Sequence, residues 1–128
     1  MLSIIVKEHN ETPEKITKML SQVEDIHKGG RDVELLFMTS MSSKDFVYKY
    51  QPWKYSYDLM VYGDVMSCGA AVNMGANYAR GNDLLVVDCH ICFDTANLNI
   101  LMNTIENNPD AMVTPALKHV DFPACDYN

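Results

Sequence analysis

The sequence predicts a single α/β domain, residues 1–128, with a mainly parallel sheet and helices on both faces. Strand-like and helix-like segments alternate along the chain, which is the order that parallel strands joined by crossover helices require. One apolar run, Leu84 to Val87, ends abruptly in Asp88 and, two residues later, His90. Because open parallel sheets bind ligands at the carboxyl ends of their strands, these two residues mark a candidate site.

The first strand is expected at Leu2 to Val6, and the first helix follows it closely. Thr12 is a suitable N-cap, and Pro13 suits the first helical position because its missing N–H is not needed there. Apolar side chains then recur at helical spacing at Ile16, Met19, Leu20, Val23 and Ile26. Gly29 and Gly30 end the helix.

The second strand is expected at Val33 to Thr39, which is apolar from Leu35 to Met38. The aromatic-rich stretch from Phe46 to Tyr57 fits neither pattern well, and a third strand follows at Leu59 to Tyr62. Ser67 to Arg80 predicts a helix rich in small residues, with Gly81 at its end. Small side chains permit close packing on a sheet or close approach to a ligand.

The fourth strand is Leu84 to Val87, and another helix begins at Asp94 or Thr95. The apolar face of that helix consists of Leu98, Leu101, Met102 and Ile105. The run Asn107 to Asp110, which contains a proline, stops it. A fifth strand is expected at Ala111 to Thr114.

Composition excludes several classes of protein. The net charge is −7, which disfavours a nucleic-acid-binding protein because the domain would repel the phosphates. No apolar run approaches the roughly 20 residues that span a bilayer, and the amino terminus lacks signal-peptide features. The spacing of the four cysteines suggests no disulfide framework, which favours a reducing, cytoplasmic setting. They are Cys68, Cys89, Cys92 and Cys125.

Asp88 and His90 are candidate metal ligands. In an extended segment, residues two apart point to the same side, so a carboxylate oxygen and an imidazole nitrogen could meet at one Mn²⁺ or Mg²⁺ ion. The plain alternative is that Asp88 caps a turn and His90 is a loop histidine. Cys89 and Cys92 also invite a redox pair or half of a zinc site, but no helix starts directly after the strand and no matching second ligand pair exists.

The loop after the first strand contains His9, Asn10 and Glu11, which could read a nucleobase or simply cap the helix. The chain has no Walker A sequence, no Gly-x-Gly-x-x-Gly and no Gly-x-Ser-x-Gly. These absences disfavour an ATPase, a dinucleotide oxidoreductase and a serine hydrolase.

Three segments together resemble the amino-terminal half of a GT-A glycosyltransferase, most similar to the family 2 type. Leu2 to Val6 with the following Asn10-Glu11 looks like the opening strand and loop of that family. Cys68 to Gly81 looks like its small-residue helix, and Leu84 to His90 like the strand that carries its Asp-x-Asp metal motif. The resemblance implies a Rossmann-like domain that binds a nucleotide-diphospho-sugar, a UDP-sugar, for transfer to an acceptor of unknown identity.

The resemblance also implies roles for individual residues. Asp88 and His90 would hold Mn²⁺ or Mg²⁺ against the donor diphosphate. Asn73 and Gly75 would lie near the phosphates or hold the adjacent turn. The residues implied to line the base and ribose pocket are His9, Asn10, Glu11 and Thr39, with Ser40 as a neighbouring hydroxyl.

The chain departs from the family pattern in four places. Its metal motif is Asp-x-His, as in polypeptide N-acetylgalactosaminyltransferases, and Thr39-Ser40 stands where an aspartate usually contacts uracil. Val72 stands where an arginine is expected. The acceptor half and its catalytic base are expected beyond Asn128, and no catalytic residue is assigned. Two rivals follow: a non-catalytic nucleotide-binding or protein-interaction module, and a nucleotidyltransferase, which should carry a Gly-rich basic loop.

Overall fold

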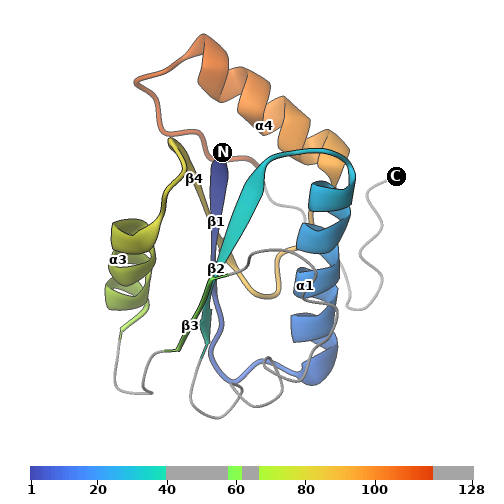
Figure 1. Cartoon of the computed structure of the whole chain (residues 1–128), viewed down its shortest axis with the longest axis vertical. Coiled ribbons are helices and arrows are strands. Elements are labelled where there is room, and N and C mark those ends of the chain that lie inside the picture. The colour runs from blue at the N-terminus through green and yellow to red at the C-terminus, as the bar shows by residue number, and fades with distance from the viewer. Residues whose placement is uncertain (40–57, 62–66, 117–128) are drawn as a thin grey trace.

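The computed structural model describes residues 1–39, 58–61 and 67–116. Four parallel strands form one sheet in the order β3-β2-β1-β4, with α1 and α4 on one face and α3 on the other (Figure 1). The α/β class and the helices on both faces are therefore confirmed. The elements are β1 (Leu2–Lys7), α1 (Pro13–Lys28), β2 (Val33–Thr39), β3 (Asp58–Val61), α3 (Cys68–Tyr78), β4 (Asp83–Asp88) and α4 (Thr95–Asn107).

The central position of β1 follows from its side chains. Ile4, Ile5 and Val6 are all completely buried, so the strand is apolar on both sides and must be covered on both. Leu2, Ile4 and Val6 pack with the core side chains of α1 and α4, whereas Ile5 packs with α3. Alternation along the strand thus divides the core into two layers.

The first helix forms as the sequence predicts. The Thr12 hydroxyl accepts a hydrogen bond from the Lys15 amide at 3.4 Å, and Pro13 is the first helical residue. Gly29 is the C-cap. The predicted apolar face is buried at all five positions, Ile16, Met19, Leu20, Val23 and Ile26.

Helix α3 lies close to the sheet because its contacting residues are small. Ala71 and Gly75 are its buried residues, and they lie over β1 and β2. A Cβ on Gly75 would lie 2.9 Å from Ile5 Cγ2 and 3.5 Å from Met38 Sδ. The glycine is therefore used for packing against the sheet.

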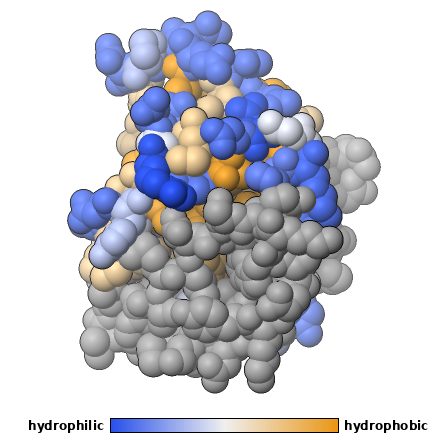
Figure 2. Space-filling model, in the orientation of Figure 1, coloured by the Kyte–Doolittle hydropathy of each residue, from blue (hydrophilic) through white to orange (hydrophobic). Residues whose placement is uncertain are grey.

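Strand β4 is less covered on the face of the sheet that it shares with Ile5 and Lys7 than on the opposite face. Leu84 is 45% exposed and Val86 is 43% exposed, since α3 packs mainly over β1 and β2. Figure 2 shows apolar side chains at the described surface near the middle of the view, between hydrophilic ones. The apolar run of β4 thus packs against the core on one side only, through the partly buried Leu85 and Val87.

The predicted fifth strand is wrong. Residues 111–116 form no strand, and the Ala111 amide donates to the Asn108 carbonyl in a turn. Met112 is 93% exposed. A short apolar run becomes a strand only where another strand pairs with its backbone. Here the amide of Ala111, the first residue of the run, donates within the turn instead.

A buried carboxylate ties the end of α3 to the amino-terminal ends of β1 and β2. Glu34 is 1% exposed and accepts hydrogen bonds from the Ser3 hydroxyl at 2.5 Å and the Arg80 amide at 2.6 Å. The Arg80 guanidinium donates to its other oxygen at 2.8 Å. The Gly81 amide in turn donates to the Ser3 hydroxyl at 2.8 Å.

Gly81→Ala is expected to lower the free energy of unfolding by about 2 kcal/mol. A Cβ there would meet the Met1 carbonyl oxygen and lie 2.6 Å from Ser3 Oγ and 2.8 Å from the Ser3 amide nitrogen, so backbone must shift. Gly69→Ala is the matched control, because its Cβ would meet only Ser67 Oγ at 4.0 Å, and alanine favours helix. Urea denaturation of both variants tests this; equal stability would contradict the close approach.

Candidate functional site

Polar and charged side chains gather where β1, β2 and β4 end. Parallel register places Lys7 beside Met38 on one side and Asp88 on the other. The backbone continues this pairing for one more residue, because the Glu8 amide donates to the Met38 carbonyl and the Cys89 amide to the Lys7 carbonyl, both at 2.9 Å. The lower end of the sheet in Figure 1 is this carboxyl edge.

Glu8 is a buried carboxylate at the centre of this edge. It is 0% exposed, and its two oxygens accept from the Thr39 hydroxyl at 2.6 Å and the Glu11 amide at 2.9 Å. It therefore links the end of β2 to the loop before α1. Sequence reasoning missed this residue, although Glu8 continues the buried alternation of Ile4 and Val6, which was the available signal.

The loop between β1 and α1 turns sharply at Asn10. Its φ is 53°, in the left-handed region, where asparagine is one of the few tolerated side chains. The side-chain nitrogen Nδ2 of Asn10 lies 3.1 Å from His9 Nε2, and both side chains are exposed. This turn brings Glu11 back toward β4.

Glu11 meets His90 across the edge. Glu11 Oε1 lies 2.9 Å from His90 Nδ1, and its other oxygen lies 3.6 Å from the Lys15 ammonium. A carboxylate on Nδ1 fixes the orientation of an imidazole and leaves Nε2 as the nitrogen that can bind a ligand. The sequence singled out both residues, but not their contact.

Asp88 has a different partner. Its Oδ1 lies 2.7 Å from the Lys7 ammonium, with the Lys7 side chain 24% exposed and that of Asp88 45% exposed. The pair follows from the register, since directly opposed residues of neighbouring strands point to the same face.

Asp88 and His90 do not lie in one extended segment, so the prediction that they point to the same side of a strand is wrong. Strand β4 ends at Asp88, and Cys89 and His90 lie in a turn that the Ile91 amide closes on the Asp88 carbonyl at 3.1 Å. Asp88 consequently bonds to Lys7 and His90 to Glu11. Among residues 1–39, 58–61 and 67–116, no three histidine, cysteine, aspartate or glutamate side chains form a metal-sized group. Metal ligation by the two residues stays a prediction.

A glutamine on the buried face of α1 holds the segment after this turn. Gln22 donates to the Ile91 carbonyl at 3.1 Å and accepts from the Phe93 amide at 3.2 Å. A polar residue beside the apolar positions of α1 was the signal for this contact. These two hydrogen bonds from Gln22 limit the motion of the chain directly after His90.

The remaining predicted residues lie in different places. Thr39 is buried at the end of β2, and Ser40 lies outside the described residues. Asn73 is exposed on α3, and Gly75 is packed beneath that helix on Ile5. The carboxyl edge thus unites Thr39, Glu11, Asp88 and His90 with Lys7 and Glu8, but the described contacts do not join the two α3 residues to them.

Of the cysteines, Cys92 differs from expectation, whereas Cys89 does not. Cys89 is a free thiol that is 1% exposed, and its burial, with help from nearby carboxylates, raises its pKa far above the usual value. Cys92 is disulfide-bonded, so Cys89 and Cys92 are not a redox pair with each other. Because disulfides are rare in the cytosol, this bond weakens the inference of a cytoplasmic setting from the cysteines.

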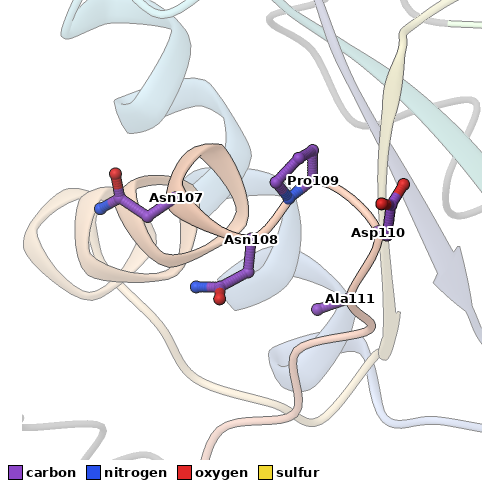
Figure 3. A pocket seen from close by; sticks show the side chains of 5 residues that line it. All are labelled: Asn107, Asn108, Pro109, Asp110 and Ala111. Carbon is purple, nitrogen blue, oxygen red and sulfur yellow. The ribbon is translucent and has the colours of Figure 1, made fainter.

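One surface hollow lies away from this edge. Figure 3 shows it at the end of α4, lined by Asn107 to Ala111, which are all exposed. It lies at the opposite end of the sheet from the carboxyl edge (Figure 1). Neutral side chains and one aspartate at the end of an exposed helix supply no convergent chemistry there.

The fold and the carboxyl edge define an α/β protein with its candidate site at the ends of parallel strands. The sequence matches the family model described as glycosyl transferase family 2 over residues 3–123. The chain therefore belongs to glycosyltransferase family 2. No curated protein and no solved structure matches it. Among the described residues, no helix is both long and apolar enough to cross a membrane.

Proposed function

We propose that this chain is a glycosyltransferase donor-binding domain and binds a UDP-sugar at the carboxyl edge of its sheet. The observation that carries the proposal is that Thr39 at the end of β2, Glu11 in the loop after β1, and Asp88 at the end of β4 lie along one edge of the sheet, where Glu8 bonds Thr39 and Glu11 and where Glu11 bonds His90. Membership of family 2 supports a nucleotide-sugar donor. The likeness of the Asp88-Cys89-His90 motif to that of polypeptide N-acetylgalactosaminyltransferases stays a prediction.

The nucleoside would occupy the end of the site at β1 and β2. Thr39 and the turn at Asn10 lie there, and Glu8 holds both in place through two hydrogen bonds, at 2.6 Å to Thr39 and 2.9 Å to Glu11. A base bound beside an already ordered loop loses less conformational freedom in the protein, which favours affinity. In this proposal Glu8 is a positioning residue, because it holds Thr39 and the loop at Glu11 rather than the nucleotide itself.

The diphosphate would lie toward β4. The carboxylate of Asp88 and the imidazole of His90 are of the donor types that suit Mn²⁺ or Mg²⁺, and phosphate oxygens would complete the coordination. A bound metal would neutralise charge on the leaving diphosphate. Asp88 and His90 would hold such a metal; Asp88 now bonds the Lys7 ammonium, which would have to leave the carboxylate, whereas the Glu11 contact with His90 Nδ1 could persist.

Calorimetric titration tests the proposal. UDP is expected to bind the chain in the presence of Mn²⁺, and to bind more weakly in EDTA. CDP is the matched control, because its base presents an acceptor where uracil presents an N–H donor. No UDP binding by the folded protein in either condition would contradict a donor site.

Donor turnover separates this function from a non-catalytic module. A transferase site that activates the donor should release UDP slowly from a UDP-sugar when water replaces the acceptor. Nucleotide binding without any UDP release, even after addition of candidate acceptors, would favour the binding module.

A further inference from the structure

One side chain of α1 holds the chain that follows His90. Gln22 is 7% exposed on the buried face of the helix; its Nε2 donates to the Ile91 carbonyl at 3.1 Å and its Oε1 accepts from the Phe93 amide at 3.2 Å. These two peptide groups flank Cys92 on either side. In a parallel sheet, a residue bonds to the peptide groups on either side of its partner in the same way. Gln22 therefore holds residues 91–93 much as a neighbouring strand would.

The orientation of the Gln22 amide follows from these partners. Its Oε1 can only accept and its Nε2 can only donate, so turning the amide over would lose both hydrogen bonds. Nε2 also donates to Met19 Sδ at 3.7 Å. Burial of a primary amide is unfavourable unless its polar atoms are bonded, and here both the oxygen and the nitrogen have partners. The side chain is thus held in one arrangement.

His90 lies between segments that are tied down on both sides. Before it, the Cys89 amide donates to the Lys7 carbonyl at 2.9 Å, which continues the sheet. After it, the chain is bonded to Gln22. The His90 ring itself lies 2.9 Å, through Nδ1, from Glu11 Oε1 in the loop before α1. The turn that carries His90 is therefore attached to β1 on one side and to α1 on the other.

We infer that Gln22 is a positioning residue for donor binding: it holds residues 91–93 against α1 and so keeps the His90 turn in place at the β4 end of the candidate site. This inference rests on the proposed function. A segment that is ordered before the nucleotide arrives loses less conformational freedom on binding, which favours affinity. Without Gln22, the Ile91 carbonyl and the Phe93 amide lose their partner, and nucleotide binding would have to restore the order of the segment.

Gln22→Met tests the inference, because methionine is also unbranched and of similar length but can form neither backbone hydrogen bond. We expect the substitution to weaken UDP binding about fivefold in a calorimetric titration. Hydrogen exchange gives an independent readout of the contact. The exchange rate of the Phe93 amide should rise about tenfold more than that of the Cys89 amide, which donates to Lys7 instead.

Ile26→Val is the matched control for loss of stability. Ile26 is 1% exposed on the same helix, and its shortening destabilises the core without removing a hydrogen bond of Gln22. Its UDP affinity should stay within about twofold of the wild type.

A loss of stability in Gln22→Met with unchanged UDP affinity would overturn the inference and leave Gln22 a purely structural residue. An equal loss of UDP affinity in Ile26→Val would overturn it as well, because affinity would then simply follow stability. Failure of the wild-type chain to bind UDP would overturn the proposed function itself. The wild-type titration thus separates the two failures.

Discussion

Glu34→Ala is expected to lower the free energy of unfolding by about 3 kcal/mol. The substitution leaves the Ser3 hydroxyl, the Arg80 amide and the Arg80 guanidinium without the carboxylate that accepts from all three. It also leaves space at a position that is 1% exposed. Urea denaturation followed by circular dichroism measures the loss. Glu106→Ala, an exposed glutamate on α4, is the matched control and should change stability by less than about 0.5 kcal/mol.

The stabilisation by Glu34 should depend on pH. Burial alone would raise its pKa, but the hydrogen bonds from Ser3 and Arg80 and the arginine charge more than offset burial and hold the pKa below its usual value. A lowered pKa in the folded state means that the contribution is complete above the unfolded pKa and is lost as the pH falls through the folded one. A stability difference between wild type and Glu34→Ala that does not shrink in acid would contradict this.

Asp88→Ala is expected to weaken UDP binding about 100-fold in the presence of Mn²⁺, which corresponds to about 2.7 kcal/mol. The substitution removes the carboxylate that is proposed to hold the metal. In EDTA, Asp88→Ala should bind UDP no more weakly than the wild type does. The variant frees the Lys7 ammonium to contact the diphosphate. Calorimetric titration under both conditions measures the two effects.

Asp110→Ala is the matched control for this experiment. It removes an exposed aspartate beyond α4, at the opposite end of the sheet from the carboxyl edge. Its UDP affinity should equal that of the wild type in both conditions. Equal UDP affinity of Asp88→Ala and Asp110→Ala with Mn²⁺ present would exclude Asp88 as the metal ligand.

Most of the fold was predictable because its signals are local. The helix from Pro13 to Lys28 carries its cap, its apolar spacing and its terminal glycines within one short segment. Strands β1 and β2 are nearly continuous apolar runs, as buried parallel strands require. The predicted strand at Ala111 to Thr114 failed because a strand depends on a partner, which no local pattern reveals.

The site was less predictable because its contacts join distant segments. The sequence drew attention to Asp88, His90 and Glu11 as residue types at strand ends. The pairing of Lys7 with Asp88 depends on the register between β1 and β4, and that of Glu11 with His90 on the turn at Asn10. The burial of Glu8 could have been predicted from the alternation of Ile4 and Val6. Buried glutamates are rare, however, so a glutamate after a strand is first interpreted as part of a solvated loop.

The most direct test of the central claim is to locate the bound nucleotide by NMR on ¹⁵N-labelled protein. A Mn²⁺–UDP complex broadens the amide signals that lie near it. We expect broadening at Lys7 to Glu11, Thr39 and Asp88 to His90, with the signals of Asn107 to Ala111 unchanged. Broadening confined to another surface, or none at saturating UDP and Mn²⁺, would contradict a donor site at the carboxyl edge of this sheet.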